Sequence, residues 1–340
     1  MRKTNRRYFA VILLFLNILL LAAFSLSFLV GRYAIPPKTV WEIILSRIFP
    51  IEPTWEETLE TVILQVRLPR ILLGILVGGA LSLSGASYQT LFKNPMVSPD
   101  ILGVSAGAGF GAALAMVNDA SWWEIQLCAF AFGMAAVVLT YFIGCTIGQQ
   151  AITVLILGGL VVSSLFQALL SIVKTMADTD NALPSITFWL MGSLGRGSGR
   201  EVLFLLPAVI FSLVLLFLFR HQINALSTGE DEAAALGVNV PLTKLVVVVA
   251  STLMTVSAVS ISGIIGWVGL VVPHIARMIS GSSFSRLAPV SFLIGGCFLL
   301  AIDDVVRGIE GVELPLGVLT ALIGTPIFIL LLYRVRKGWS

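Results

Sequence analysis

Charged residues are scarce in this chain. Lys, Arg, Asp and Glu together make up 11% of its 340 residues, whereas a water-soluble domain is usually about 25% charged. Hydrophobic residues make up 57%. Most of the surface must therefore face lipid. The formal net charge of +3 is small and the basic residues are scattered, so nucleic acid is excluded as a partner.

The residues that build metal centres and covalent sites are also rare. Only two histidines occur, His221 and His274, and the three cysteines stand in apolar runs without the spacing of a disulfide or zinc site: Cys128, Cys145 and Cys297. We therefore expect no metal, no cofactor and no catalytic residue. The GxxxxGK[ST] phosphate loop is absent too, so the chain is not itself an ATPase.

The apolar segments lack the polar groups that two other classes of membrane protein require. An ion-driven secondary transporter normally buries acids near the bilayer midplane. Here Asp303 and Asp304 lie near a segment edge, and the segment centres contain no Asp or Glu. An intramembrane enzyme needs a paired nucleophile and base or a metal set, and no segment contains one. Both classes are disfavoured.

Ten apolar segments are present, and each is a candidate membrane helix. The first is too long for the apolar region of a signal peptide, and we expect it to remain as an anchor. The segments 101–117 and 267–280 are short and contain Gly or adjoin Pro, a pattern typical of helices that border a transport pathway. The sequence predicts one all-α transmembrane domain over residues 1–340, with helices near 8–30, 68–90, 101–117, 122–146, 152–175, 201–220, 241–261, 267–280, 287–306 and 315–333.

Basic residues at the two ends of the chain fix the orientation. An even number of spans puts both termini on one side, and the positive-inside tendency makes that side cytoplasmic. The flanking residues are Arg2, Lys3, Arg6 and Arg7 before the first span, and Arg334, Arg336 and Lys337 after the last.

Three long motifs stand in the same order as in a known transporter family. Arg67-Leu-Pro-Arg70 precedes GASYQTLFKNPMVSPDILGVSAGAG at 85–109, followed by GIIGWVGLVVPHIAR at 263–277 and ELPLGVLTALIGTP at 313–326. The chain resembles the permease subunits of ATP-binding-cassette (ABC) importers for iron-siderophore, haem and cobalamin, which have the type II importer fold. The resemblance implies structural roles for signature positions Pro273, His274, Arg277, Pro315 and Gly317.

The resemblance also implies partners, location and cargo. We expect a homodimer with the path between its two copies, two ATP-hydrolysing subunits inside, and one substrate-binding protein outside. The expected location is the cytoplasmic (inner) membrane of a bacterium or archaeon, with the lipid bilayer around the spans. An iron-siderophore chelate is the first expectation for the cargo, and haem, cobalamin or an oxyanion are the alternatives.

Three of the basic residues on the outer side in this topology are docking candidates. Arg67 and Arg70 are three apart and share a helix face, at what the apolar pattern predicts to be a helix start, where positive charge opposes the helix dipole. They could pair with lipid headgroups or with Glu56, Glu57 and Glu60, or they could dock an acidic protein. The resemblance favours docking. Arg307 is a weaker docking candidate, because its spacing predicts an ion pair with Asp303.

The cytoplasmic loop over residues 221–241 has the pattern of a capped helix. Ser227 and Glu230 have the spacing of a capping box, acids fill the first turn, and Gly237 can end the helix. The resemblance implies that this helix couples the permease to the ATPase. The candidate coupling residues are Ser227, Glu230, Glu232, Leu236 and Gly237.

Two further segments supply candidates for the pathway or its gate. Asn94 and Met96, with Thr153, lie in or beside inner turns, and Trp189 and Met191 lie in a segment that resembles the family's short extra helix. Ordinary loop chemistry or interfacial anchoring would explain the same residues. Separately, Gly103, Gly107 and Gly111 have the spacing that lets two membrane helices pack closely.

Overall fold

A computed structural model describes residues 2–31, 33–50, 52–148, 152–309 and 314–337 of the chain. Within these ranges all regular structure is helical. The first part contains α1 (Arg2–Ser27), α2 (Pro37–Leu45), α3 (Glu57–Thr61), the π-helical segment η1 (Val62–Arg67), α4 (Leu68–Leu91), α5 (Val104–Val117), α6 (Trp122–Gly148) and α7 (Ile152–Met176). The rest contains α8 (Ala182–Leu190), α9 (Gly199–Leu218), α10 (Arg220–Leu226), α11 (Glu230–Ala235), α12 (Val240–Ser262), α13 (Val268–Ser280), α14 (Phe284–Gly308) and α15 (Leu316–Lys337).

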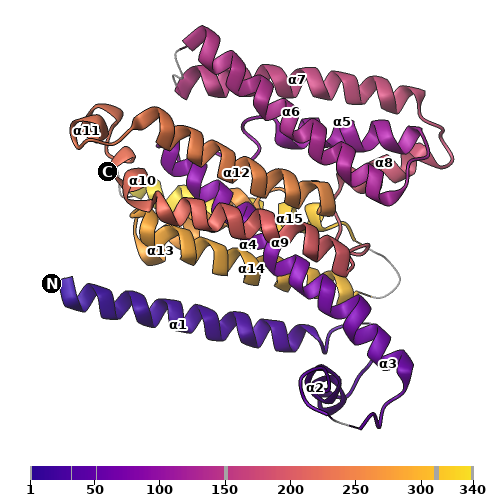
Figure 1. Cartoon of the computed structure of the whole chain (residues 1–340). Coiled ribbons are helices and arrows are strands. Elements are labelled where there is room, and N and C mark those ends of the chain that lie inside the picture. Colours follow the sequence, from indigo (N-terminus) through magenta and orange to yellow (C-terminus); the bar gives the residue numbers. More distant parts are fainter. Residues whose placement is uncertain (1, 32, 51, 149–151, 310–313, 338–340) are drawn as a thin grey trace.

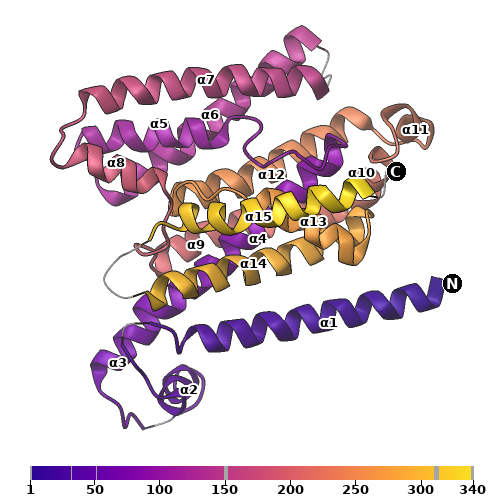
Figure 2. The same cartoon turned by 180° about the vertical axis from the view of Figure 1, so that it is seen from behind.

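Ten of these helices account for the ten apolar segments. Seven are long and apolar enough to cross a membrane, and α5, α13 and α15 contain the three shorter apolar helices. The two chain ends lie at the same end of the bundle as α10 and α11 in both views (Figures 1 and 2). This arrangement agrees with an even number of crossings.

Helix α4 forms the centre of the molecule. It packs against α14, α12, α13 and α9, and 83% of its most apolar window is buried. Small residues let its neighbours approach, because a Cβ atom at Gly78 or Gly85 would overlap the backbone carbonyl of Gly295 or Gly269. Helix α1 lies at the edge of the bundle (Figure 1), with only 6% of its window buried.

The helix that contains α4 begins earlier than the apolar pattern predicts. Helix α3, η1 and α4 form one continuous helical stretch of 35 residues, Glu57–Leu91. Arg67 and Arg70 therefore lie inside a helix. The expected conflict with the helix dipole at a helix start is wrong, because that effect is confined to the first turn.

The two short helices are confirmed as short. Helices α5 and α13 have 14 and 13 residues, less than the roughly 20 that a full crossing takes. The adjoining non-helical segments 92–103 and 263–267 contain buried residues such as Val97, Leu102 and Ile265. Irregular backbone in a membrane protein needs such burial, because lipid cannot satisfy its polar groups.

Candidate transport and partner sites

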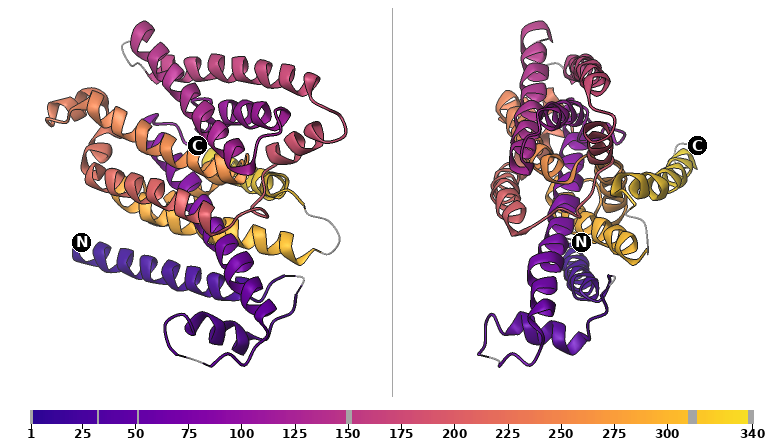
Figure 3. Two further views of the ribbon diagram at one scale, coloured as in Figure 1. Left: turned by 45° about the vertical axis from the view of Figure 1, so that its right-hand side comes forward. Right: turned by 90° about the vertical axis from the view of Figure 1, so that its right-hand side faces the viewer.

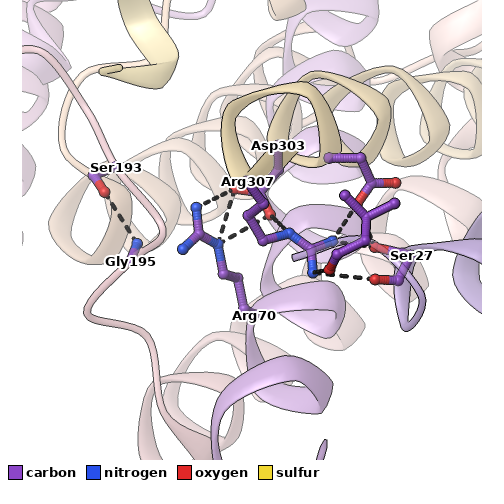
Figure 4. A network of polar contacts seen from close by, with 8 residues as sticks. Ser27, Arg70, Ser193, Gly195, Asp303 and Arg307 are labelled. Atoms are coloured by element: carbon purple, nitrogen blue, oxygen red, sulfur yellow. Dashed lines mark hydrogen bonds and ion pairs between the residues drawn. The ribbon is translucent and has the colours of Figure 1, made fainter. Parts of the chain in front are cut away.

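An ion-pair network joins three helices at the end of the bundle opposite the chain termini. Asp303 on α14 is fully buried and accepts from Nε of Arg70 at 3.0 Å and from its Nη2 at 2.8 Å. The predicted ion pair with Arg307, one turn further along α14, is present at 3.0 Å. Figure 4 shows both guanidinium groups directed at this carboxylate. One carboxylate thus forms ion pairs with two arginines.

Arg307 also ties α1 to α14. Its Nη1 donates to the carbonyl oxygens of Ser27 and Val30, at 3.1 and 3.2 Å, and its Nη2 contacts Asp304 and the Ser27 hydroxyl. The Ser27 hydroxyl in turn donates to Asp304 at 2.6 Å. Asp304, to which the sequence pattern gave no role, is therefore the second acid of the network.

Arg67 is held by carbonyl oxygens instead of acids. Its guanidinium donates to the carbonyls of Phe28 and Tyr33, in the connection between α1 and α2. The alternative of pairing with upstream glutamates is wrong for both Arg67 and Arg70, whose partners are those given above. Glu60 pairs with Arg47.

The three docking candidates line one outer pocket of about 240 Å³, bordered by Val30, Gly31, Tyr33, Val62, Val66 and Val306. Arg67 is only 5% exposed, and the side chains of Arg70 and Arg307 are 16% and 8% exposed. Asp303 and Asp304 pair with Arg70 and Arg307, whereas Arg67 bonds only to carbonyl oxygens, so the three arginines and two acids leave one excess positive charge at this pocket. The structure therefore groups the three candidates but gives each of them internal partners.

The loop over residues 221–241, which we expect on the cytoplasmic side, forms two short helices, α10 and α11, and its cap differs from the predicted one. The Ser227 hydroxyl donates back to the Asn224 carbonyl at 2.6 Å, so the expected Ser227–Glu230 capping box is wrong. Gly229 is the residue before α11. The flexible carboxylate of Glu232 curls back over it.

Of the other coupling candidates, some contact the rest of the protein and others are exposed. Glu230 accepts from Lys244 of α12 at 2.7 Å, which fixes α11 to a membrane helix. Gly237 has φ +80° and ends the helix as expected. Leu236 is 72% exposed.

The inner gate candidates lie in exposed turns. The Asn94 side chain accepts from the Met96 backbone N–H at 2.9 Å, which holds a tight turn after α4. Met96 is 49% exposed, and Thr153 is exposed near the start of α7. Their role in a gate stays a prediction.

The outer pathway candidates lie at a junction of α8, α12 and α15. The backbone N–H of Gly317 donates to the Met191 carbonyl at 2.9 Å, and that of Leu316 to the Gly192 carbonyl at 2.9 Å. A Cβ atom at Gly317 would overlap the Met191 carbonyl, and one at Gly263 would overlap the Trp189 carbonyl. The signature glycine at 317 is thus explained by close backbone contact.

Trp189 and Met191 differ in burial. Trp189 is 6% exposed and belongs to an apolar cluster with Ile186 and Val259, so interfacial anchoring is wrong for it. Trp189 lines a small cavity between α8, α12 and the start of α6, and its indole Nε1 is buried without a hydrogen-bond partner among the described residues. Met191 is 39% exposed.

The remaining signature residues contribute to packing. Pro273 is buried within α13, and the Pro315 carbonyl accepts the first hydrogen bonds of α15 from Val318 and Leu319. His274 is half-buried, and Arg277 donates to the Gln89 side chain of α4 at 3.2 Å. Glu313, the first residue of the last motif, lies outside the described residues.

Two polar residues that the sequence analysis did not single out are central contacts. Gln89 joins α4 to α13, and Asn224 joins α10 to α14. Gln89 could have been noticed in the sequence, because it is a glutamine inside an apolar run. No comparable signal in the sequence pointed to Asn224, because its partners lie 59 to 61 positions away.

Metal and disulfide chemistry find no support in the part of the chain that the structure describes. It contains no group of three or more His, Cys, Asp or Glu residues placed to hold a metal ion. Cys128, Cys145 and Cys297 are free thiols.

Similarity to characterised proteins extends over nearly the whole chain. Residues 19–334 match the FecCD transport family. The molybdate import system permease MolB of Haemophilus influenzae is 38% identical over 328 residues, covering 96% of each chain. The ferric enterobactin permease FepD of Escherichia coli is 36% identical over 327 residues, covering 95% of each.

A solved structure shares the fold. It comes from an ABC transporter assigned to the metal-chelate type, in an inward-facing conformation. It superposes with a TM-score of 0.85 at 36% identity, covering 96% of this chain and 99% of the other. The all-helical fold with about ten spans is thereby confirmed. The chain belongs to the FecCD transport family and is a multi-pass membrane permease of a bacterial or archaeal ABC importer, whose ATPase is a separate subunit.

Proposed function

We propose that this permease moves an iron-siderophore-type chelate inward between two copies of the chain. The observation that carries the importer assignment is the match of the whole ten-helix chain to a metal-chelate type transporter. The iron-chelate cargo is supported by the similarity to FepD over 95% of the chain. The residues that we place beside the path, Asn94, Met96, Thr153, Trp189 and Met191, are all uncharged, and an uncharged path suits a bulky chelate.

Molybdate is the second candidate cargo. It is favoured by MolB, whose 38% identity also extends over nearly the whole chain. The cargo's chemistry differs sharply between the two candidates, because molybdate is a small oxyanion and a ferric siderophore is a large chelate. Haem and cobalamin are further alternative cargoes for the same class of importer.

The partners follow from the same proposal. Two ATPase subunits would bind the cytoplasmic loop around α10 and α11, where Leu236 offers an exposed apolar contact. One binding protein would dock outside over the pocket that contains Arg67, Arg70 and Arg307. The second copy of the chain would cover part of the apolar surface that this copy leaves open.

Uptake by the reconstituted complex tests the cargo. The permease, its ATPase and its binding protein are placed in liposomes, and uptake of ⁵⁵Fe-labelled ferric enterobactin is compared with that of ⁹⁹Mo-labelled molybdate. We expect ATP-dependent accumulation of the iron chelate alone. Accumulation of molybdate alone would establish the second candidate, and a permease that fails to bind any ATPase would overturn the importer proposal.

A further inference from the structure

The start of α14 is capped by a residue from another helix. Ser283, which precedes α14, makes no cap bond to the helix with its own side chain. The Oδ1 of Asn224 on α10 accepts from the Phe284 backbone N–H at 2.6 Å and from the Ser283 hydroxyl at 3.3 Å. Its Nδ2 donates to the Ser285 hydroxyl at 2.7 Å. One side chain thus satisfies groups that helix starts otherwise leave open.

Apolar packing reinforces this contact. Ile223 and Leu226 of α10 are 0% and 2% exposed and belong to the same core cluster as Phe284. Hydrogen bonds and packing therefore both hold α10 to the first turn of α14. On its other side α10 is joined to α11 by only Ser227, Thr228 and Gly229.

A second polar link leads from α13 towards the inner gate candidates. Arg277, one turn before the end of α13, donates to Gln89 Oε1 at 3.2 Å. The Gln89 amide is 1% exposed and donates to the carbonyls of Val97 and Leu270, each at 3.3 Å. Val97 belongs to the segment 92–103, which also contains Asn94 and Met96.

The two links are close together, because α13 and α14 are separated by only residues 281–283. In Figure 1, α10, α11 and the cytoplasmic end of α13 lie at the same end of the bundle. A displacement of α10 would shift the start of α14 and the end of α13 together. Gln89 would then transmit that shift to segment 92–103. Packed and hydrogen-bonded helices are the physical means by which such displacements travel.

We propose that Asn224 and Gln89 are positioning residues that carry movement of the ATPase-facing loop, through α13 and α14, to segment 92–103. The inference rests on the proposed function of the α10–α11 loop as the ATPase contact. It assigns the mechanical link to two neutral amides inside the protein, away from the surface that the ATPase would touch.

A spectroscopic readout on the gate segment tests this link without knowledge of the cargo. Met96→Cys is labelled with a nitroxide in a background in which Cys128, Cys145 and Cys297 are Ala. The labelled permease is reconstituted with its ATPase. We expect ATP with vanadate to change the electron paramagnetic resonance line shape in this protein, and Asn224→Ala to reduce that change at least twofold.

Asn239→Ala is the matched control. The Asn239 side chain also caps a helix, accepting from the Leu242 backbone N–H at 3.1 Å, but the bond stays within α12. The two variants lose the same kind of cap, and only Asn224→Ala loses a link between helices. The inference is overturned if both variants keep the full spectral change, or if both lose it equally.

Further variants keep the test decisive. Asn224→Asp retains the acceptor and places a negative charge where a helix start favours it. The Ser285 hydroxyl can donate to this carboxylate in place of accepting from the lost Nδ2, so we expect a full response. Loss of the response in Asn224→Asp would contradict the capping role. If Asn224→Ala does not accumulate, Ser285→Ala removes only the 2.7 Å bond. We expect a partial loss there, and an unchanged response would refute the inference.

A double variant tests whether the two amides lie on one route. Asn224→Ala with Gln89→Ala should lose no more response than the more damaged single variant, because independent sites would add. Replacement of residues 228–236 by Gly-Ser separates this inference from the proposed function. If ATPase binding and response both survive that replacement, the coupling role of the loop fails. If that replacement abolishes the response while Asn224→Ala preserves it, only the assignment of Asn224 fails.

Discussion

At the scale of single residues, the outer network depends on one buried carboxylate. Asp303 is fully buried and compensates both Arg70 and Arg307, whereas Asp304 is partly exposed and faces Arg307 alone. Removal of one partner from a buried ion pair leaves the other charge unpaired, which costs far more than the pair itself contributes. The two neighbouring acids are therefore expected to differ in their effect on stability.

Asp303→Asn should destabilise the permease by about 3–5 kcal/mol, because two buried guanidinium groups lose their shared counter-charge. Thermal unfolding in detergent, followed by size-exclusion chromatography, measures this loss. Asp304→Asn is the control, and it should lower the midpoint much less. Equal midpoints for the two variants would show that Asp303 does not hold the network together.

Docking through the outer pocket is a second prediction at this scale. Arg70→Gln should reduce the on-rate of the binding protein by up to about tenfold at low salt, because one steering charge is lost. Arg70 suits this test better than Arg67, whose guanidinium holds two backbone carbonyls. The on-rate at two salt concentrations is the measurement, and the variant should also show the weaker salt dependence.

Arg47→Gln is the matched control for docking. Arg47 is an exposed arginine that pairs with Glu60 and does not line the outer pocket. Its loss should leave the rate nearly unchanged. The same rate in wild type and Arg70→Gln would return these arginines to a purely structural role.

At the scale of elements, close helix contacts decide which glycines matter. On α5, a Cβ atom at Gly107 or Gly111 would overlap the carbonyl of Phe132 or Cys128 on α6. The predicted close packing at these two positions is therefore present. Gly103 has a different role, because it precedes α5 with φ +87°, a conformation that other residues rarely adopt.

Gly107→Leu should destabilise the permease by about 1–3 kcal/mol or more, because α5 and α6 must separate to admit the side chain. The yield of monodisperse protein and its thermal midpoint measure the effect. Gly199→Leu is the control, since a Cβ atom at Gly199 has no neighbour within 4 Å. Normal yield and uptake by Gly107→Leu would contradict the packing argument.

The coupling element yields a separate prediction. Leu236→Ser should weaken ATPase binding without a change in thermal midpoint, because the exposed side chain has little internal packing to lose. Co-purification of the ATPase with tagged permease measures binding. Glu230→Gln provides the comparison, and it should lower the midpoint slightly by loosening α11 from Lys244. Full ATPase binding by Leu236→Ser would place the contact elsewhere.

At the scale of the whole molecule, a single copy leaves much apolar surface uncovered. Helix α15 projects from the bundle in the end-on view of Figure 3, and Leu322, Ile329 and Leu330 on it are 60–67% exposed. Lipid can cover such a surface, and so can a second copy. A path between two copies requires the second arrangement.

Native mass spectrometry should find two permease chains in each complex. Cysteines introduced at Leu322 or Leu330, in a background without native cysteine, should then form disulfide-linked dimers upon oxidation. A cysteine at Leu14 on α1, which is also exposed, should not. A complex with one permease chain would rule out the path between copies.

The sequence alone determined the ten spans and the family. Hydropathy and motif order are local properties, and they change little when the chain folds. The Asp303–Arg307 pair, the glycine at the end of α11 and the short helices α5 and α13 were predictable for the same reason, since each depends on residues a few positions apart.

Only the tertiary structure decided the long-range partners. Arg70 finds Asp303 across 233 positions, Arg67 finds the carbonyls after α1, and Asn224 caps α14 in place of Ser283. The expected Ser227 cap failed because that hydroxyl bonds within α10 instead. Buried polar groups must be satisfied by whatever partners packing brings near them, and a linear pattern does not contain that proximity.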